Sequence, residues 1–342
     1  MGAVSLKKKK AGKIVLIVLG SILLLLLLLA LGLFIYANIM LNKLDRTEIT
    51  GDINLPEEQI YDGPTVDAED SVEEIEEAQK QLEEVQKIEI QKQEGIVNIL
   101  LIGSDRRTMN ENGRSDSMMM VSLNYNTQKI HITSLMRAMY VCIPRSDGDI
   151  WGMLNAAYSW GGPNLLVDTV EQNFRIKIDH YVVVDFTAFE KAVNLVGGLE
   201  LTLTEAEANF VKVSPGTQHL NGIQVRDYCR IRYIDNDFKR TGRQRNVITL
   251  LLQKAAQSDL STLMEMADNI LPLVNTNMTN GEIMSYLIKT LPMFKNVSKG
   301  RMLPIENESG TTYTGMIYVG GREMYKVDFE TNVKALHEYI QS

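Results

Sequence analysis

"SMMMVSLNYNTQKIHITSLM", residues 117 to 136, consists of two apolar runs separated by the short polar segment "NTQ". Short runs of this kind on either side of a polar turn predict two strands joined as a hairpin. Just upstream, "IVNILLIGSD" (96–105) is an apolar run that ends in a glycine and a carboxylate. It predicts a further strand, so this region is expected to form the centre of a sheet.

Helices and strands alternate on the C-terminal side of this hairpin. Predicted helices are 162–174, 187–198 (closed by glycine), 246–257, 260–274, 280–292 and 329–341; predicted strands are 178–186, 199–204 and "CRIRY" (229–233), with a short strand-rich piece before the last helix. This alternation predicts an α/β (mixed α+β) fold with a mixed central sheet flanked by helices on both faces.

The N-terminal part predicts a membrane anchor. Ile14 to Ala37 is a run of 24 residues without a charge, which as a helix spans a hydrocarbon core of about 30 Å. The run is longer than the apolar part of a signal peptide, and no small-residue cleavage site follows it. Five lysines precede it and no acid does. Flanking Lys and Arg stay in the cytoplasm, so residues 1–13 are predicted to be cytoplasmic and the rest of the chain after the span to lie outside.

An acidic segment follows the predicted span. Residues 44–95 carry 17 acidic and 4 basic side chains, whereas the remainder from Ile96 has a net charge near −1. We expect residues 38–94 to form an extracellular linker or stalk and 95–342 to form the folded domain. Ile75, Ala78, Leu82 and Val85 have helical spacing, but the pattern covers barely two heptads. It favours a solvated spacer helix over a coiled coil.

The stretch "RIRYIDNDFKRTGRQR" (230–245) concentrates five arginines and a lysine against two aspartates. On the predicted strand, Arg230 and Arg232 share one face; on a helix starting near Arg240, that residue, Arg243 and Gln244 share one side. Guanidinium groups pair with phosphate oxygens, so a phosphate or pyrophosphate site is one interpretation. A salt-bridge network with the aspartates at 235 and 237 is the other.

A pair of carboxylates predicts a possible metal site. Asp105 ends one predicted strand and Asp116 precedes the next, so both can point into one cleft, where oxygen donors suit Mg²⁺. A surface pair of Arg114 with Asp116 is the alternative.

Cys142 and Cys229 are the only cysteines. They are interpreted as buried free thiols. The alternative interpretation is that the fold brings the two thiols close to each other. No Walker loop, CxxC pair or nucleophile elbow is present.

Several ordered blocks resemble the LytR-CpsA-Psr family between about Val97 and Ala256. They are "NILLIGSDRR", "GRSDSMMMVSLN", "TSLMRAMYVCIP", "LNAAYSWGG", "IDHYVVVDFTAFEKAVNLVGGLEL" and "LNGIQVRDYCRIRYIDNDFKRTGRQRNVI". A single-helix anchor with an outside domain is also the usual topology of this family.

The resemblance implies an enzyme of the Gram-positive cell envelope. Such a protein would transfer an anionic glycopolymer, such as wall teichoic acid or capsular polysaccharide, from an undecaprenyl-pyrophosphate carrier to peptidoglycan. Asp105 and Asp116 would hold Mg²⁺. The pyrophosphate would be held by Arg137, Arg232 and Arg240, together with Arg114, Arg230 and Gln244, and the polyprenyl tail would lie in an apolar pocket between sheet and helices.

The sequence departs from the family pattern at one place. Where the family commonly reads "PRD", this chain has Met136, Arg137 and Ala138, so any support that the aspartate gives to the arginine must come from another carboxylate, such as Asp105. A noncatalytic scaffold for lipid-linked polymer is therefore an alternative function. A transcriptional attenuator is a weaker one, because the basic cluster is predicted to lie outside the cytoplasm and no nucleic acid partner is expected.

Overall fold

The computed structural model describes residue 28 and residues 31–46, 72–104, 115–232, 234–305, 315–319 and 321–342. The chain divides into two compact units, Met1–Leu44 and Asp45–Ser342. In the first, residues 31–41 are helical, and most of the predicted span 14–37 lies outside the described residues. Within the described ranges, no helix combines the length and apolar character needed to cross a membrane.

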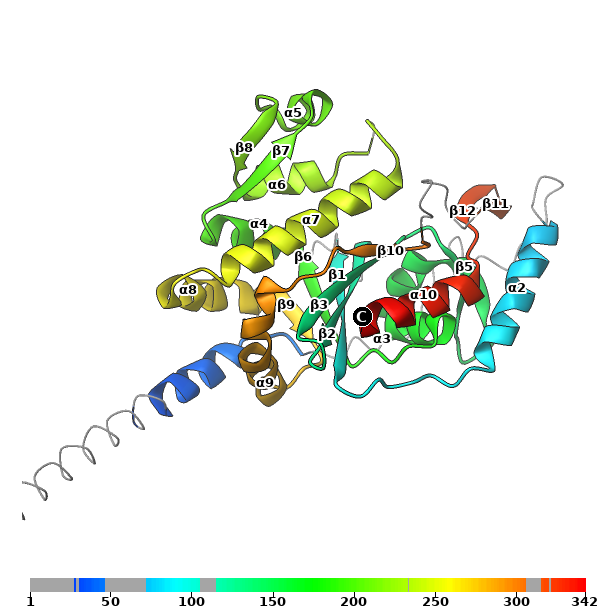
Figure 1. Ribbon diagram of the computed structural model, residues 1–342, viewed down its shortest axis with the longest axis horizontal. Helices are drawn as coiled ribbons and strands as arrows, with labels where there is room; N and C mark the ends of the chain where they lie inside the picture. Colours follow the sequence, from blue (N-terminus) through cyan, green and yellow to red (C-terminus); the bar gives the residue numbers. More distant parts are fainter. Residues whose placement is uncertain are drawn as a thin grey trace, which may run out of the picture. The chain divides into compact units, whose positions relative to one another are not determined.

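A six-stranded mixed sheet forms the centre of the second unit (Figure 1), in the order β10-β3-β2-β1-β6-β9. The strands are β1 (Ile96–Ser104), β2 (Ser115–Asn124), β3 (Lys129–Leu135), β6 (His180–Asp185), β9 (Val274–Thr276) and β10 (Arg301–Leu303). The β1–β2, β2–β3 and β6–β9 pairs are antiparallel, whereas β1–β6 and β3–β10 are parallel. The hairpin, the preceding strand and the mixed central sheet are confirmed.

One face of the sheet carries the main hydrophobic core. It is covered by α2 (Val72–Gln86), the kinked α3 (Leu154–Phe174) and α10 (Phe329–Gln341), drawn on the right in Figure 1. Leu100 and Ile102 of β1 and Met118 and Met120 of β2 point into this core, and all four are almost fully buried. Alternate residues of the same strands face the other way because side chains along a strand alternate between faces.

The opposite face is covered by α4 (Phe186–Leu195), α7 (Asp237–Ala255), α8 (Leu260–Ile270) and the short η3 (Leu291–Lys295). Met119 and Ile132 of the sheet pack there with Ile248 and Leu252 of α7. Beside it, α5 (Glu205–Val211), α6 (Gly222–Cys229) and the pair β7 (Leu199–Leu203) and β8 (Gly216–Leu220) enclose a second core with α4 and α7. The predicted helices flanking both faces are confirmed.

The remaining elements lie outside the central sheet. They are β4 (Tyr140–Ile143), β5 (Ile150–Met153), η2 (Leu271–Leu273), α9 (Asn280–Thr290), β11 (Met316–Val319) and β12 (Arg322–Tyr325). Among them, β4 is fully buried. The pairs β4–β5 and β11–β12 form separate two-stranded sheets. The strand-rich piece predicted near the C-terminus is confirmed by β11 and β12, and the predicted closing helix is confirmed by α10.

Two sequence predictions about local structure are wrong. The "CRIRY" strand does not form: a capping box between Asn221 and Gln224 starts α6, which continues to Cys229. The acidic helix is not a solvated spacer, because its apolar stripe is buried, from Ala78 at 0% to Ile75 at 6% exposure. That stripe packs against Tyr140, Ile317 and the main core, so α2 belongs to the folded unit.

Candidate active site

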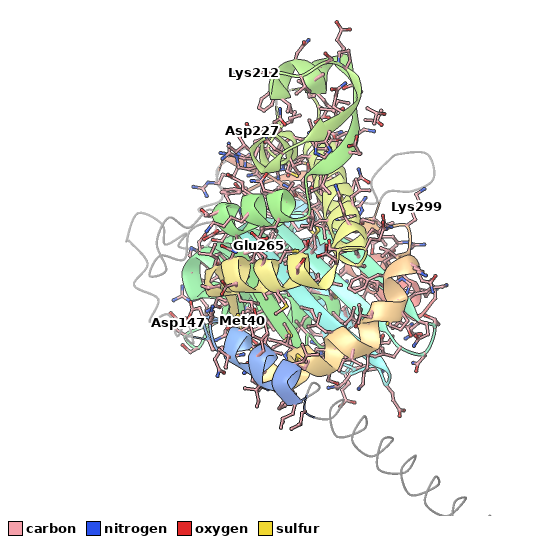
Figure 2. The ribbon with its side chains drawn as sticks, turned by 90° about the vertical axis from the view of Figure 1, so that its left-hand side faces the viewer. Met40, Asp147, Lys212, Asp227, Glu265 and Lys299 are labelled. Carbon is pink, nitrogen blue, oxygen red and sulfur yellow. The ribbon has the colours of Figure 1, made fainter. Side chains whose placement is uncertain are left out.

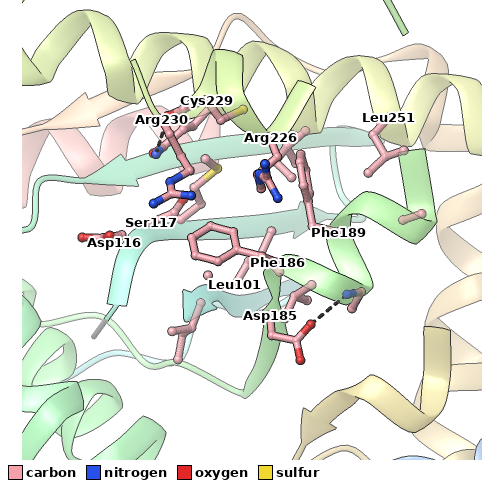
Figure 3. A pocket seen from close by; sticks show the side chains of 18 of the residues that line it. Leu101, Asp116, Ser117, Asp185, Phe186, Phe189, Arg226, Cys229, Arg230 and Leu251 are labelled. Atoms are coloured by element: carbon pink, nitrogen blue, oxygen red, sulfur yellow. Dashed lines mark hydrogen bonds between the residues drawn. The ribbon is translucent and has the colours of Figure 1, made fainter. Parts of the chain in front are cut away.

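A largely apolar cavity of about 280 Å³ lies between the sheet and the helices of its second face. Its floor consists of Leu101 and Gly103 of β1, Met119 of β2 and Val184 of β6. Its walls come from α4, α6, α7 and the end of α8, namely from Phe186, Phe189, Ala192, Cys229, Ile248, Leu251, Leu252 and Ile270. Figure 3 shows Phe186 and Phe189 projecting from α4 toward this space. The apolar pocket between sheet and helices that the resemblance implies is present.

The floor of the cavity is shaped by β1. Its residues alternate between buried and half-buried along the whole strand, and the half-buried set includes Leu101 and Gly103. At Gly103 a side chain would meet Cβ of Ser117 at 3.1 Å, and the register with β2 shifts between Gly103 and Ser104. A register shift of this kind is typical of a β-bulge, which bends the end of a strand.

Polar side chains gather at one end of the cavity, around Asp116 at the start of β2. Arg137, from the segment between β3 and β4, donates from Nη1 to Asp116 Oδ1 at 3.2 Å. Arg232, which follows α6, donates from Nη2 to Asp116 Oδ2 at 3.0 Å. One carboxylate therefore joins two guanidinium groups whose residues lie 95 positions apart in the sequence.

Asp237, the first residue of α7, is the second carboxylate of this cluster. Its Oδ2 lies 3.5 Å from Arg137 Nε, and its Oδ1 lies 2.6 Å from Arg240 Nη1. The support for Arg137 that Ala138 cannot give thus comes from Asp116 and Asp237. Asp105, which the sequence suggested for this role, lies outside the described residues.

Arg240 is the most deeply buried member, with 3% of its surface exposed. Burial lowers its pKa; Asp237 opposes this shift, and the positive charges of Arg137 and Arg232 add to it. Arg240 Nε has no hydrogen-bond partner among the described residues. Three guanidinium groups face two carboxylates here, so a net positive charge remains at the end of an apolar cavity. An anion bound there would supply the missing acceptor oxygens.

Arg230 and Gln244, which the sequence assigns to the pyrophosphate site, also line the cavity. Arg230 caps the C-terminus of α6, and its guanidinium lies 5.2 Å from the centre of the Phe186 ring (Figure 3). Gln244 donates to the backbone carbonyl of Cys229 at 3.3 Å. Both side chains therefore lie where the polar end meets the apolar walls.

Arg243 does not join this cluster. It pairs with Asp235 at 2.5 Å and donates to the Ile231 carbonyl at 2.8 Å, so the salt-bridge interpretation is correct for this arginine. Arg240, Arg243 and Gln244 do lie at helical spacing on α7, which starts at Asp237 with Asn236 as N-cap. Of the three, Arg240 and Gln244 line the cavity and Arg243 does not.

Sequence reasoning missed Arg226, which lines the cavity from α6 and pairs with Glu190 at 2.6 Å. In the sequence, the adjacent Asp227 makes a local ion pair the simpler interpretation of Arg226, and the structure does show that pair as well. Of the remaining predicted site residues, Asp105 and Arg114 lie outside the described residues. In the part of the chain that is described, no group of three or more His, Cys, Asp or Glu side chains forms a metal site.

Asp116 nonetheless fits one part of a magnesium site. Each of its oxygens accepts one hydrogen bond from an arginine, and a carboxylate has about four acceptor positions in all. Lone pairs thus remain for a cation at the cavity end.

Cys142 and Cys229 are both free thiols. Burial raises the pKa of each thiol to about 12. In Cys142, the nearby carboxylate of Asp149 adds to this effect. At neutral pH both are therefore protonated, which makes them poor nucleophiles.

Comparisons with known proteins agree with the resemblance. The sequence model of the LytR_cpsA_psr family matches residues 65–335. Biofilm regulatory protein A of Streptococcus mutans is 37% identical over 243 residues, which cover 66% of this chain but 59% of that protein. The polyisoprenyl-teichoic acid–peptidoglycan teichoic acid transferase TagU of Oceanobacillus iheyensis is 31% identical over 254 residues, covering 71% of this chain and 77% of that protein.

Among solved structures, protein gbs0355 of Streptococcus agalactiae superposes with a TM-score of 0.61 at 26% identity. The superposition covers 76% of this chain and 88% of that one. The family resemblance inferred from the sequence blocks is thus confirmed, and the fold is shared.

Proposed function

Because the chain belongs to the LytR_cpsA_psr family, we propose that it transfers an anionic glycopolymer from an undecaprenyl-pyrophosphate carrier to peptidoglycan. Wall teichoic acid and capsular or secondary wall polysaccharide are the polymers considered. The observation that supports this most directly is the shape of the cavity. Its apolar walls suit a polyprenyl chain, and its cationic end suits the pyrophosphate joined to that chain.

In this proposal the three guanidinium groups of Arg137, Arg232 and Arg240 bind the pyrophosphate oxygens. Asp116 and Asp237 hold them in place, so little reorganisation accompanies binding. Arg230 and Gln244 contact groups next to the pyrophosphate. Arg114, predicted from the sequence, completes the set.

The reaction is a phosphoryl transfer. A hydroxyl of a muramic acid residue attacks the phosphorus nearer the glycan and loses its proton to water, the bond to the bridging oxygen breaks, and polyprenyl monophosphate leaves. Negative charge grows on the bridging and nonbridging oxygens in the transition state. The fixed guanidinium groups stabilise this charge, and the cavity positions the two substrates for in-line attack. No described side chain has to form a covalent intermediate.

We assign Mg²⁺ to Asp116, with Asp105 as the predicted second ligand. When bound, Mg²⁺ would neutralise charge on the pyrophosphate and polarise its oxygens. The location follows from the sequence topology: residues 1–13 in the cytoplasm, a span at 14–37 and the catalytic unit outside the cell membrane.

The test uses the purified full chain with a synthetic polyprenyl-pyrophosphate oligosaccharide and uncrosslinked peptidoglycan strands, with Mg²⁺ or with chelator. Wild type is expected to form glycan-linked peptidoglycan only with Mg²⁺. Arg232→Ala and Asp116→Ala are expected to form none while circular dichroism shows a folded protein. Arg145→Ala removes an arginine that pairs with Asp147 outside the cavity and serves as the control.

Two results would contradict the proposal. Full transfer by a folded Arg232→Ala or Asp116→Ala variant would show that the cationic end does not perform the chemistry. Tight binding of the lipid-linked substrate by wild type without product, under conditions in which a related transferase is active, would favour the noncatalytic scaffold that the missing aspartate at Ala138 suggested.

A further inference from the structure

α9 and η3 expose three large aliphatic side chains on one side. Leu287, Ile288 and Leu291 are 50%, 66% and 55% exposed, and their spacing places them next to each other on a helix surface. The other side of α9 faces the protein: Tyr286 contacts His180 at 3.0 Å, and Thr290 is buried. Figure 1 shows α9 at the outer edge of the unit, beyond β9.

Single exposed leucines are common on soluble surfaces, but a contiguous cluster marks a surface that meets an apolar phase or a partner. The charged residues around the cluster indicate which of the two, an apolar phase or a protein partner, it meets. Lys289 and Lys295, on the same two elements, are exposed. The one acidic residue of α9, Glu282, is held in the capping box with Thr279. An apolar face accompanied by lysines fits a lipid surface with anionic headgroups.

The path of the chain provides an independent argument. Asp45 forms a β-bridge with Asn275 of β9. Arg46 donates to the Met278 carbonyl at 2.8 Å and to the side chain of Asn280, the first residue of α9. The chain therefore enters the folded unit at the start of α9. The predicted span ends at Ala37, eight residues earlier, and eight residues reach at most about 28 Å when fully extended.

We propose that the face formed by Leu287, Ile288 and Leu291 rests on the outer surface of the membrane. Its side chains enter the boundary between headgroups and acyl chains, about 5–10 Å deep, and the lysines meet the phosphates. The inference goes beyond the transfer reaction and does not depend on it, because it uses only the predicted span, the chain entry at Asp45 and this surface.

The same placement has a consequence for the cavity. Ile270 lines the apolar part of the cavity and lies four residues before β9, the strand beside which the chain enters. A membrane contact on α9 and η3 would thus hold the apolar part of the cavity at a fixed height above the lipid that supplies the polyprenyl chain.

The experiment measures how close α9 lies to lipid in the full chain reconstituted into vesicles of phosphatidylcholine and phosphatidylglycerol. In a Cys142→Ala, Cys229→Ala background, a fluorophore is attached at Ile288→Cys, and quenching by lipids carrying a nitroxide near the headgroup is recorded. Ile223→Cys on α6 is the matched control, because Ile223 is 52% exposed. Leu28→Cys reports on the predicted span.

The expected result is quenching at 288 that is several-fold stronger than at 223, with 28 also quenched by a deeper nitroxide. Equal weak quenching at 288 and 223 overturns the proposal, and so does an unquenched label at 28, since no span then holds the unit at the membrane. Disulfide cross-linking between two copies of the unlabelled Ile288→Cys variant, together with no lipid quenching of the labelled protein, would identify a second copy as the occupant and overturns the proposal as well.

A second variant separates membrane contact from mere proximity. Ile288→Glu places a charge in the apolar face, and a fluorophore at Leu291→Cys in that background is expected to lose most of its quenching while the thermal midpoint stays near that of wild type. Unchanged quenching in a folded protein would mean that the apolar face makes no contact with lipid. Transfer activity enters neither readout, so failure here leaves the proposed function untouched.

Discussion

The two faces of the central sheet are built from the same strands but differ in how they are filled. On one face, Leu100 and Ile102 of β1 are fully buried against α3 and α10. On the other face, Leu101 is half-buried and forms the floor of a cavity. Apolar residues alternate with equal regularity on both faces, so the pattern of the strand predicts burial and not what fills the space above it.

This difference shows which face of the sheet mainly stabilises the fold and which face leaves space for a ligand. A packed face gains transfer and dispersion energy from every buried methylene group. A cavity forfeits part of this energy, because an unfilled apolar space costs stability roughly in proportion to its volume. That loss is tolerated where a ligand fills the space. The polar cluster around Asp116 lies on the face that has the cavity.

The largest expected effect comes from removing the buried charge at the cavity end. Arg240→Met keeps an unbranched side chain but deletes the guanidinium. Loss of one preorganised charge at a transition state lowers the rate by about 100-fold to 1000-fold. Transfer to peptidoglycan strands by the full chain measures this, with Arg145→Met as the control. Transfer activity within a factor of about two of wild type would show that the charge at the end of the cavity is not needed for catalysis.

Two adjacent leucines test the comparison of the faces directly. Leu100→Ala should lower the free energy of unfolding by about 2–5 kcal/mol, because it leaves a void in the packed core. Leu101→Ala should cost less, about 1 kcal/mol, since that side chain already borders empty space. Chemical denaturation of the full chain in detergent gives both values.

The same two variants should show the opposite order in substrate binding. Leu101→Ala is expected to raise the KM for the lipid-linked substrate, and Leu100→Ala to leave it unchanged well below the melting temperature. If Leu100→Ala changed the KM more than Leu101→Ala, the division of the two faces into core and cavity would have to be abandoned.

Much of the fold could be predicted from the sequence because its long strands and helices have regularly spaced apolar residues. The hairpin of β2 and β3 and the helices α4 and α7 follow from periodicity and from turn residues. The "CRIRY" strand prediction fails because two arginines alternating with Cys, Ile and Tyr are compatible with a helix end as well. The capping box at Asn221 starts α6, which extends into this segment. The helix α2 was predicted with its correct stripe, but a stripe cannot say whether it packs on its own domain.

The site was predictable in its residue types and less so in its pairing. Arg232 and Arg240 stand in a conspicuous run of basic residues, and Asp116 stands at the start of a strongly apolar strand. The partners of Arg137 could not be predicted, because Asp116 and Asp237 approach it from β2 and α7 through tertiary packing. Arg226 was hidden beside Asp227. For Asp105 and Arg114, the sequence prediction remains a prediction.

The last expected effect is confined to alkaline pH and concerns the buried thiol of the packed face. The pKa of Cys142 is raised to about 12 by burial first and by Asp149 second, from an ordinary value of 9.0. A raised pKa in the folded state means that the unfolded chain ionises first as the pH increases. The stability contributed by the neutral thiol is therefore complete below about pH 9 and is lost progressively between about pH 9 and pH 12.

Cys142→Ala should remove this part of the alkaline loss. Other groups, such as Tyr228, also titrate in that range in both proteins, so the informative quantity is the difference in slope of unfolding free energy against pH. We expect the slope of the variant to be shallower above pH 9 and equal to that of wild type between pH 7 and 8. Parallel slopes across the whole range would mean that water reaches the thiol, and that the face filled by α3 and α10 is less closed than its buried leucines indicate.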